Sequence, residues 1–131
     1  MFLGDFVEQL AAMLQQRSVS MPFENEAPWH ELFYELKYLE SAGKPPFFDQ
    51  LRFDWDGPYP KSAELSEFLH ALHWNACVDA RNPHFDTITL APDIATAWSH
   101  QSTELSSNAR EFLDLAVERA VERFCKSALQ M

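Results

Sequence analysis

The sequence contains little positive charge and no long apolar run. Lysine and arginine number 10 against 20 aspartate and glutamate residues, which gives a formal charge of −10. A charge of this sign repels phosphate backbones and anionic lipid surfaces and favours basic partners. No apolar run approaches the roughly 20 residues that a transmembrane helix requires. We therefore predict no membrane span and consider nucleic acid a disfavoured partner.

Cysteine is scarce, and the common catalytic motifs are absent. Cys77 and Cys125 are the two cysteines, and neither belongs to a CxxC pair. Asp5 stands where a secretory signal would carry positive charge, so a cytoplasmic protein is predicted. The chain also lacks a GxSxG motif, a P-loop and a dinucleotide-binding fingerprint, and we predict no enzymatic activity.

The composition is nevertheless that of a folded protein. The 131 residues are 47% hydrophobic and 14% aromatic, which is sufficient for a substantial core. No internal repeat, low-complexity tract or linker divides the sequence. A single domain over residues 1–131 is predicted.

An alternating apolar pattern followed by a proline-rich corner lies near the centre of the chain. Leu51, Phe53 and Trp55 alternate with polar residues, which predicts a β-strand over residues 51–56. The next four residues contain two prolines, which fix φ and lack a backbone donor, so the strand ends there. The predicted structural corner comprises Trp55, Gly57, Pro58 and Tyr59.

A helix is predicted directly after this corner, over residues 62–74. Ser62 can cap it, and Glu64 lies near the positive end of its dipole. Its apolar residues have helical spacing and form one stripe: Leu65, Phe68, Leu69 and Leu72.

The remaining elements are predicted from periodicity, proline and glycine. Helices are expected over 2–17, from Pro28 to a stop at Gly43, over 92–99 and over about 108–130, with a short helical turn over 47–50. Strands over 76–80 and 85–90 are expected to form a β-hairpin.

This order of elements is that of a winged helix, in which the hairpin is the wing. We therefore predict an α+β, mostly helical fold with a winged-helix-like three-helix core, a small antiparallel sheet and a long C-terminal helix. Core and wing would occupy 1–107, and the last helix 108–131. That helix is longer than a three-helix core requires, so part of its apolar stripe is predicted to form a homodimer interface.

The segments LFYELKYLESAG (32–43) and LRFDWDGPYPKSAELSEFLHAL (51–72) resemble uncharacterised bacterial winged-helix proteins related to Panacea-type antitoxin domains. The resemblance covers about a third of the chain. Its positions are Leu32, Tyr34, Leu36, Phe53, Gly57, Pro58, Tyr59, Glu64 and Leu65. Pro60 and Lys61 depart from the pattern, in which the tyrosine is followed almost directly by Ser-Pro-Glu-Leu. The resemblance implies a protein partner that is a toxin or a proteolysis machine.

Several side chains could in principle support chemistry. Asp54 and Asp56 share a face of the predicted strand and could share a proton or hold a metal, or they could be solvated edge charges. His70 and His73 are three residues apart and could ligate a metal together with His30 or Glu67, but no dedicated ligand motif accompanies them. We predict no catalytic residue, no metal and no cofactor.

DNA binding is the function that a winged helix suggests. The helix over 62–74 would enter the major groove, yet its expected exposed face carries Glu64 and Glu67 against the single base Lys61. Arg81 at the wing tip is a weak counter-signal. Arginine and lysine residues of the last helix alternate with acids, which is typical of a solvated face with ion pairs.

The preferred interpretation is a non-enzymatic, acidic protein-interaction module of antitoxin or defence-regulator type, which binds a basic protein or toxin. The alternatives are a winged-helix transcription regulator and a small hydrolase or metal-dependent enzyme. The aromatic residues near predicted corners could form an exposed anchor or complete the core: Phe47, Phe48, Trp55, Tyr59, Trp74 and Trp98. The predicted partner-binding residues are Tyr59, Lys61, Glu64, Glu67, His70, His73, Trp74 and Arg81.

Overall fold

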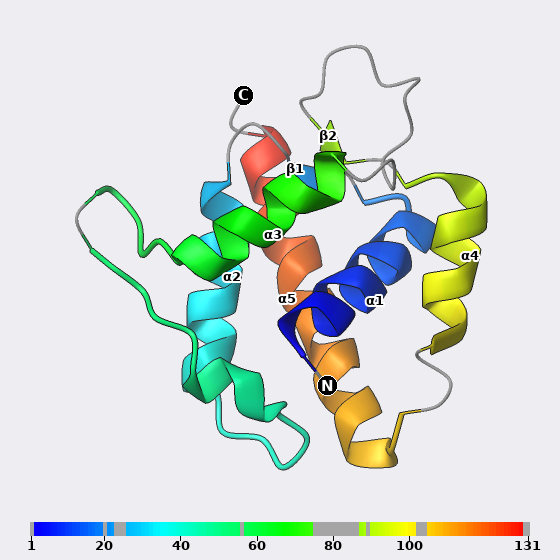
Figure 1. The fold of residues 1–131 in the computed structure, drawn as a ribbon, viewed down its shortest axis with the longest axis horizontal. Coiled ribbons are helices and arrows are strands. Elements are labelled where there is room, and N and C mark those ends of the chain that lie inside the picture. Colours follow the sequence, from blue (N-terminus) through cyan, green and yellow to red (C-terminus); the bar gives the residue numbers. More distant parts are fainter. Residues whose placement is uncertain are drawn as a thin grey trace.

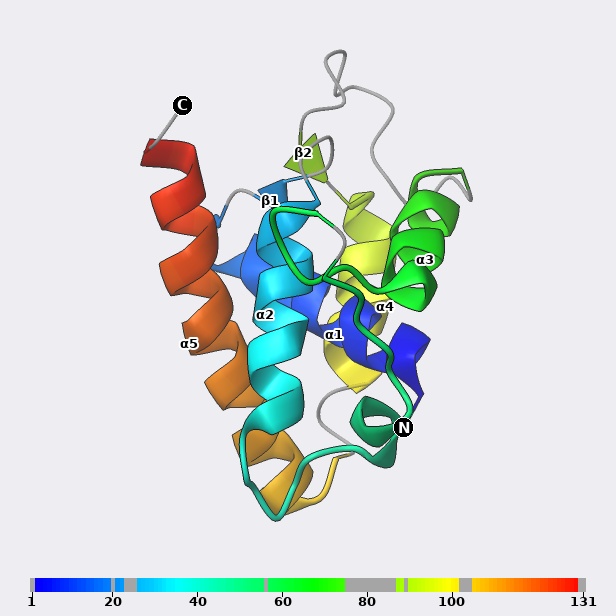
Figure 2. The same cartoon turned by 90° about the vertical axis from the view of Figure 1, so that its left-hand side faces the viewer.

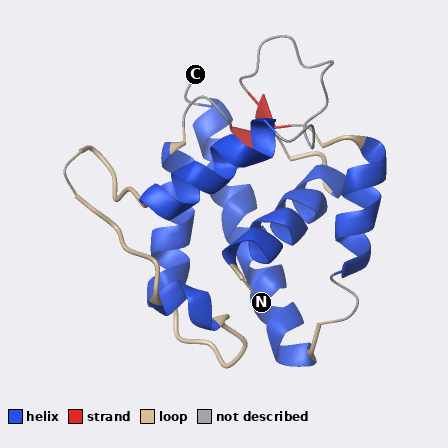
Figure 3. Cartoon of the chain, in the orientation of Figure 1, coloured by secondary structure: helices blue, strands red, loops and turns tan. Residues whose placement is uncertain are grey.

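The computed structural model describes residues 2–19, 21–22, 26–55, 57–74, 87–88, 90–101 and 105–129. Within them the chain forms five α-helices, one 3-10 helix and two strands of two residues each (Figures 1 and 3). The elements are α1 (Leu3–Gln16), β1 (Met21–Pro22), α2 (Ala27–Tyr38), η1 (Pro46–Asp49), α3 (Ala63–Trp74), β2 (Thr87–Ile88), α4 (Pro92–Gln101) and α5 (Ser107–Leu129).

The predicted helices are confirmed, with slightly shifted ends. Helices α1, α3, α4 and α5 occupy the expected ranges, and the predicted turn over 47–50 is η1. Helix α2 begins near Pro28 as predicted, but it ends at Tyr38, before Gly43. Its C-cap, Leu39, has extended backbone angles that stop the helix without glycine.

Helix α1 lies at the centre of the helical body. It packs against α4 and α5, and α2 packs against α5 (Figures 1 and 2). The ring of Phe6 on α1 contacts Phe33 on α2, Phe47 and Phe48 on η1, and Phe112 on α5, with centroid separations of 5.4 to 5.9 Å. One buried aromatic ring therefore joins four elements of the core.

The predicted winged-helix-like fold with a small antiparallel sheet is wrong, although the mostly helical character is confirmed. The described residues contain no antiparallel sheet of the predicted kind. Met21 pairs with Ile88, Pro22 pairs with Thr87, and Asp54 forms a bridge with Lys61. Pairing this short cannot form a layer of the fold, and the core is built from helices instead.

The predicted strand over 51–56 is also wrong. Among residues 51–55, Asp54 alone has a bridge partner, Lys61. The alternating residues are not equally buried: Leu51 is 4% exposed, Phe53 is half-buried and Trp55 is 60% exposed. The alternation of apolar and polar residues is typical of an extended chain, but a β-strand also needs a hydrogen-bonded neighbouring strand. Here the chain turns back on itself as a projecting loop (Figure 1).

The predicted hairpin falls mostly outside the described residues. The expected strand over 76–80 and the turn after it lie entirely outside them. Of the second expected strand, Thr87 and Ile88 pair with β1, which comes from a segment predicted to be a loop.

Helix α5 is part of the core along much of its length. Its buried residues include Phe112, Leu113, Val117 and Phe124, which face α1 and α2. The stripe that was predicted to contact a second copy is thus used within the chain as far as Phe124. Dimerisation through this helix stays a prediction.

None of the helices in the described ranges combines the length and the apolar composition that crossing a bilayer requires.

Candidate functional site

Helix α3 presents an acidic ridge on its exposed side. Glu64, Glu67 and His70 are exposed and follow one another at three-residue spacing, which places them along one face. Leu65 and Leu69 are buried on the opposite side, as the apolar spacing predicted. The ridge is therefore held on a rigid element by a well-packed stripe.

A groove of about 610 Å³ lies beside this ridge, between α3, η1 and the start of α1. Its apolar lining comes from Phe2, Leu3, Gly4, Phe47, Leu51, Phe68 and Ala71, and its polar lining from Gln50, Glu64 and Glu67. Figure 2 shows the first turn of α1 lying between α3 and η1. We call this hollow, with its two carboxylates, the acidic groove.

The first turn of α1 is fixed where it borders the acidic groove. The backbone N–H of Phe2 donates to Asp5 Oδ2 at 3.1 Å, which caps the helix. The Phe2 side chain remains 79% exposed at the edge of the groove. A Cβ on Gly4 would lie 2.9 Å from Phe68 Cε2, so the absence of a side chain there lets α1 approach α3 closely.

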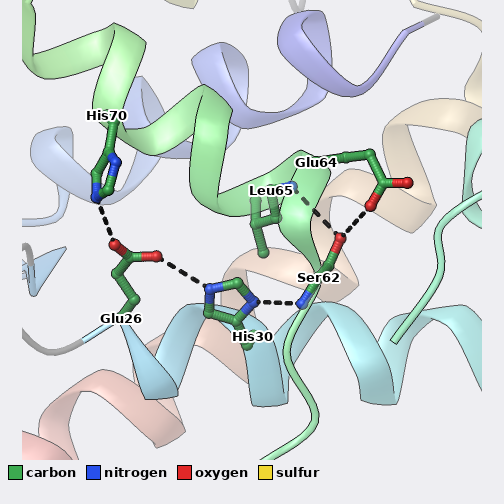
Figure 4. Close-up of polar contacts among 6 residues, drawn as sticks. All are labelled: Glu26, His30, Ser62, Glu64, Leu65 and His70. Carbon is green, nitrogen blue, oxygen red and sulfur yellow. Dashed lines mark hydrogen bonds and ion pairs between the residues drawn. The ribbon is translucent and has the colours of Figure 1, made fainter. Parts of the chain in front are cut away.

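A polar network behind the ridge joins α2 to α3 (Figure 4). His30, which is fully buried, approaches Glu26 Oε1 through Nε2 at 3.1 Å, and its Nδ1 accepts the backbone N–H of Ser62 at 3.0 Å. The second carboxylate oxygen of Glu26 pairs with Nε2 of His70 at 2.9 Å. We call Glu26, His30 and Ser62 the latch, because they connect the first turns of the two helices.

The latch requires neutral His30. Because Nδ1 accepts a backbone N–H, the ring proton resides on Nε2 and is donated to Glu26. Burial lowers the pKa of His30, which outweighs the opposing influence of Glu26. Burial alone would raise the pKa of Glu26, but hydrogen bonds from His30 and Ser66 and the nearby His70 bring it below its ordinary value.

The latch does not have the geometry of a nucleophilic triad. The hydroxyl of Ser62 donates to Glu64 Oε2 at 3.0 Å and accepts the N–H of Leu65 at 3.4 Å, so it caps α3. His30 contacts the backbone nitrogen of Ser62 and could not serve as a base toward its oxygen. These contacts stabilise the fold. The absence of a catalytic residue stays a prediction.

Among the described residues, no group of three or more His, Cys, Asp or Glu side chains is arranged so that it could hold a metal ion. His70 and His30 both contact Glu26, but the side chain of His73 lies outside the description. The possible metal site formed by His70 and His73 therefore falls partly outside the described residues.

The predicted corner residues lie in the projecting loop, away from the acidic groove. The ring of Tyr59 packs 5.6 Å from that of His30, and Tyr59 is half-buried. Trp55 contacts Tyr34 edge-on at 5.5 Å. Gly57 and Pro58 are exposed and, with Tyr59, border a hollow of about 380 Å³ on one side of the loop.

The predicted partner-binding residues that the structure describes lie in different surroundings. Glu64 and Glu67 line the acidic groove, Lys61 is exposed in the loop, and His70 binds back to Glu26. The side chains of His73 and Trp74, and all of Arg81, lie outside the described residues.

Sequence reasoning missed the latch carboxylate and the part of the groove contributed by α1. Glu26 and His30 have the four-residue spacing of a helical ion pair, which could have indicated their contact. Phe2 carried no comparable signal, because its place beside α3 depends on how α1 packs.

Comparison of the chain with protein-family models, curated proteins and solved structures found no match. The resemblance to Panacea-type antitoxin-related domains stays a prediction from the sequence.

Proposed function

We propose that this chain is a non-enzymatic protein-interaction module that binds a basic, partly apolar segment of a protein partner in the acidic groove. The observation that carries the proposal is the combination of an apolar floor with the carboxylates of Glu64 and Glu67 at its edge. Apolar surface supplies binding energy, and unpaired carboxylates select and orient a cationic partner.

The charges around the groove support a basic partner over an acidic one. Neither Glu64 nor Glu67 has an ion-pair partner among the described residues. Glu64 accepts a hydrogen bond from the hydroxyl of Ser62. The overall charge of −10 adds long-range attraction for a positive segment. An amphipathic helix with Lys or Arg beside apolar residues fits these requirements.

The antitoxin-like resemblance fits the same mode of action. It implies a toxin as partner, and the scarcity of cysteine favours the cytoplasm as the place where the two proteins meet. A role as a DNA-binding transcription regulator was inferred from a winged-helix fold, and that fold is wrong. The exposed ridge of α3 is also acidic and would repel the phosphate backbone.

Charge reversal in the groove tests this proposal. The wild-type chain and a Glu64→Lys/Glu67→Lys variant would be used as baits in source-cell lysate, and recovered proteins identified by mass spectrometry. An Asp93→Lys/Glu111→Lys variant is the matched control, because it makes the same charge change at exposed positions on α4 and α5. The recovered protein would then be purified and titrated against all three chains.

We expect a basic protein to bind wild type and control equally and the groove variant on the order of tenfold more weakly or worse, because two carboxylates become repulsive. The circular dichroism spectra of the three chains should agree. Equal affinity of the groove variant, or loss of binding in the control as well, would refute recognition by the acidic groove.

A further inference from the structure

We propose that a second copy of this chain docks on the outer edge of the projecting loop, with residues 52–55 of the two copies antiparallel and Phe53 opposite Phe53. This interface shares no residue with the acidic groove and does not depend on the proposed function. It also differs from dimerisation through α5. The proposal rests on an open backbone edge, an exposed aromatic cluster and self-complementary charge.

The backbone of this segment is paired on one side alone. Asp54 exchanges both backbone hydrogen bonds with Lys61, at 2.9 and 3.0 Å. Neighbouring residues of an extended chain point their N–H and C=O groups to the opposite side. Phe53 and Trp55 accordingly direct theirs away from Lys61, and neither forms a backbone hydrogen bond within the described part of the chain. Such an edge is a template for another strand.

The side chains along this edge expose a large aromatic surface. Phe53 and Trp55 both meet the ring of Tyr34 edge-on, at 5.4 and 5.5 Å, and Tyr38 meets Tyr34 at 5.0 Å. Trp55 is 60% exposed and Tyr38 65% exposed. The edge-on contacts hold the rings in place before binding, so covering them costs little side-chain entropy.

Charge complementarity points to a second copy as the occupant. Arg52 and Asp54 are exposed, and neither has an ion-pair partner among the residues that the structure describes. In a two-fold antiparallel register centred on Phe53, Arg52 of each copy lies directly opposite Asp54 of the other.

The shape of the molecule leaves this edge accessible. Figure 1 shows the loop standing out from the helical body on the left, beside α2, and Figure 2 shows it from that side with no helix in front of it. Two copies can therefore meet through their loops with the bodies on opposite sides.

A charge-swap series tests the interface. Sedimentation velocity over a wide range of protein concentration would be measured for wild type, Arg52→Asp, Asp54→Arg and the double variant. We expect wild type to form a concentration-dependent dimer. Each single variant should dissociate about tenfold more readily, because two like-charge pairs replace two ion pairs, and the double variant should recover the wild-type constant.

Glu111→Arg on α5 controls for a change of charge at an exposed acid and should leave the dissociation constant unchanged. Thermal unfolding of Arg52→Asp should match wild type, because Arg52 has no ion pair within the described chain to lose. Asp54→Arg sets an arginine opposite Lys61 and should lower the unfolding temperature slightly. A wild-type chain that stays monomeric, a dimer that both single variants preserve, or a double variant as weak as the single ones would each overturn the proposal.

Discussion

At the scale of single residues, Gly43 lies close against the backbone at the start of α5. A Cβ added there would lie 1.8 Å from the carbonyl oxygen of Asn108 and 2.3 Å from its carbonyl carbon. Backbone atoms at the start of α5 cannot move aside as a flexible side chain can. The sequence pattern suggested a helix stop at this glycine, whereas its structural role is close approach to a distant element.

Gly43→Ala should therefore lower the free energy of unfolding by about 2 kcal/mol or more, because the methyl group forces the turn away from α5. Gly57→Ala is the matched control: no atom lies within 4 Å of its added Cβ and its φ is not positive, so a change within about 0.5 kcal/mol is expected. Urea denaturation of the two variants and wild type measures this. Equal stability of both variants would show that α5 does not constrain Gly43.

The aromatic residues illustrate what a sequence leaves undecided at this scale. Phe47, Phe48 and Trp98 are buried, whereas Trp55 is exposed, although all four were predicted near corners or element ends. Residue type and local pattern are similar at these positions. Their burial depends on which distant element packs over them, as Phe6 does over Phe47 and Phe48.

At the scale of elements, the latch makes the attachment of α2 to α3 sensitive to acid. Burial lowers the pKa of His30 in the folded chain. In the unfolded chain histidine titrates at about 6.5, so the unfolded chain binds a proton more readily than the folded chain does. The stabilisation from neutral His30 is complete above that pH and is lost as the pH falls below it. The lowered pKa of Glu26 acts in the same direction at more acidic pH.

We predict that the pKa of His30, followed by the NMR shift of its ring proton, lies below that of an exposed histidine. The free energy of unfolding should fall between pH 7.5 and pH 5, and it should fall less in His30→Gln, which cannot titrate. The charges that face His30 are Glu26 and Lys61, and both are present in the variant. A His30 resonance that titrates at or above the ordinary value would contradict the latch.

The elements also show how far periodicity alone can predict. Each helix was recognisable because its apolar spacing and its proline or capping residues are local properties. The small sheet was not predictable in the same way. Residues 51–55 alternate in character, but among them Asp54 alone has a bridge partner, Lys61. The sequence of β1 has no strand pattern, yet β1 pairs with β2. Strand pairing depends on contacts that the sequence does not encode locally.

At the scale of the whole molecule, several of the few cations form ion pairs within the chain. Arg123 pairs with Glu31 and Glu35, and Arg119 lies 3.8 Å from Glu35. Arg17 pairs with Glu118 at 2.7 Å. Of the local ion pairs predicted along the last helix, Arg110 with Asp114 is present. The other pairs reach across to α2 and α1 instead. Among the described residues no Lys or Arg side chain pairs with Glu64 or Glu67, which supports the proposed binding of a basic partner in the acidic groove.

Hydrogen exchange with the captured partner bound tests this account most directly. We expect slower amide exchange in residues 2–8, 46–51 and 63–71, which form or flank the acidic groove, and unchanged exchange along α4. Protection confined to α4, α5 or the loop over 52–61, with none beside the groove, would contradict it.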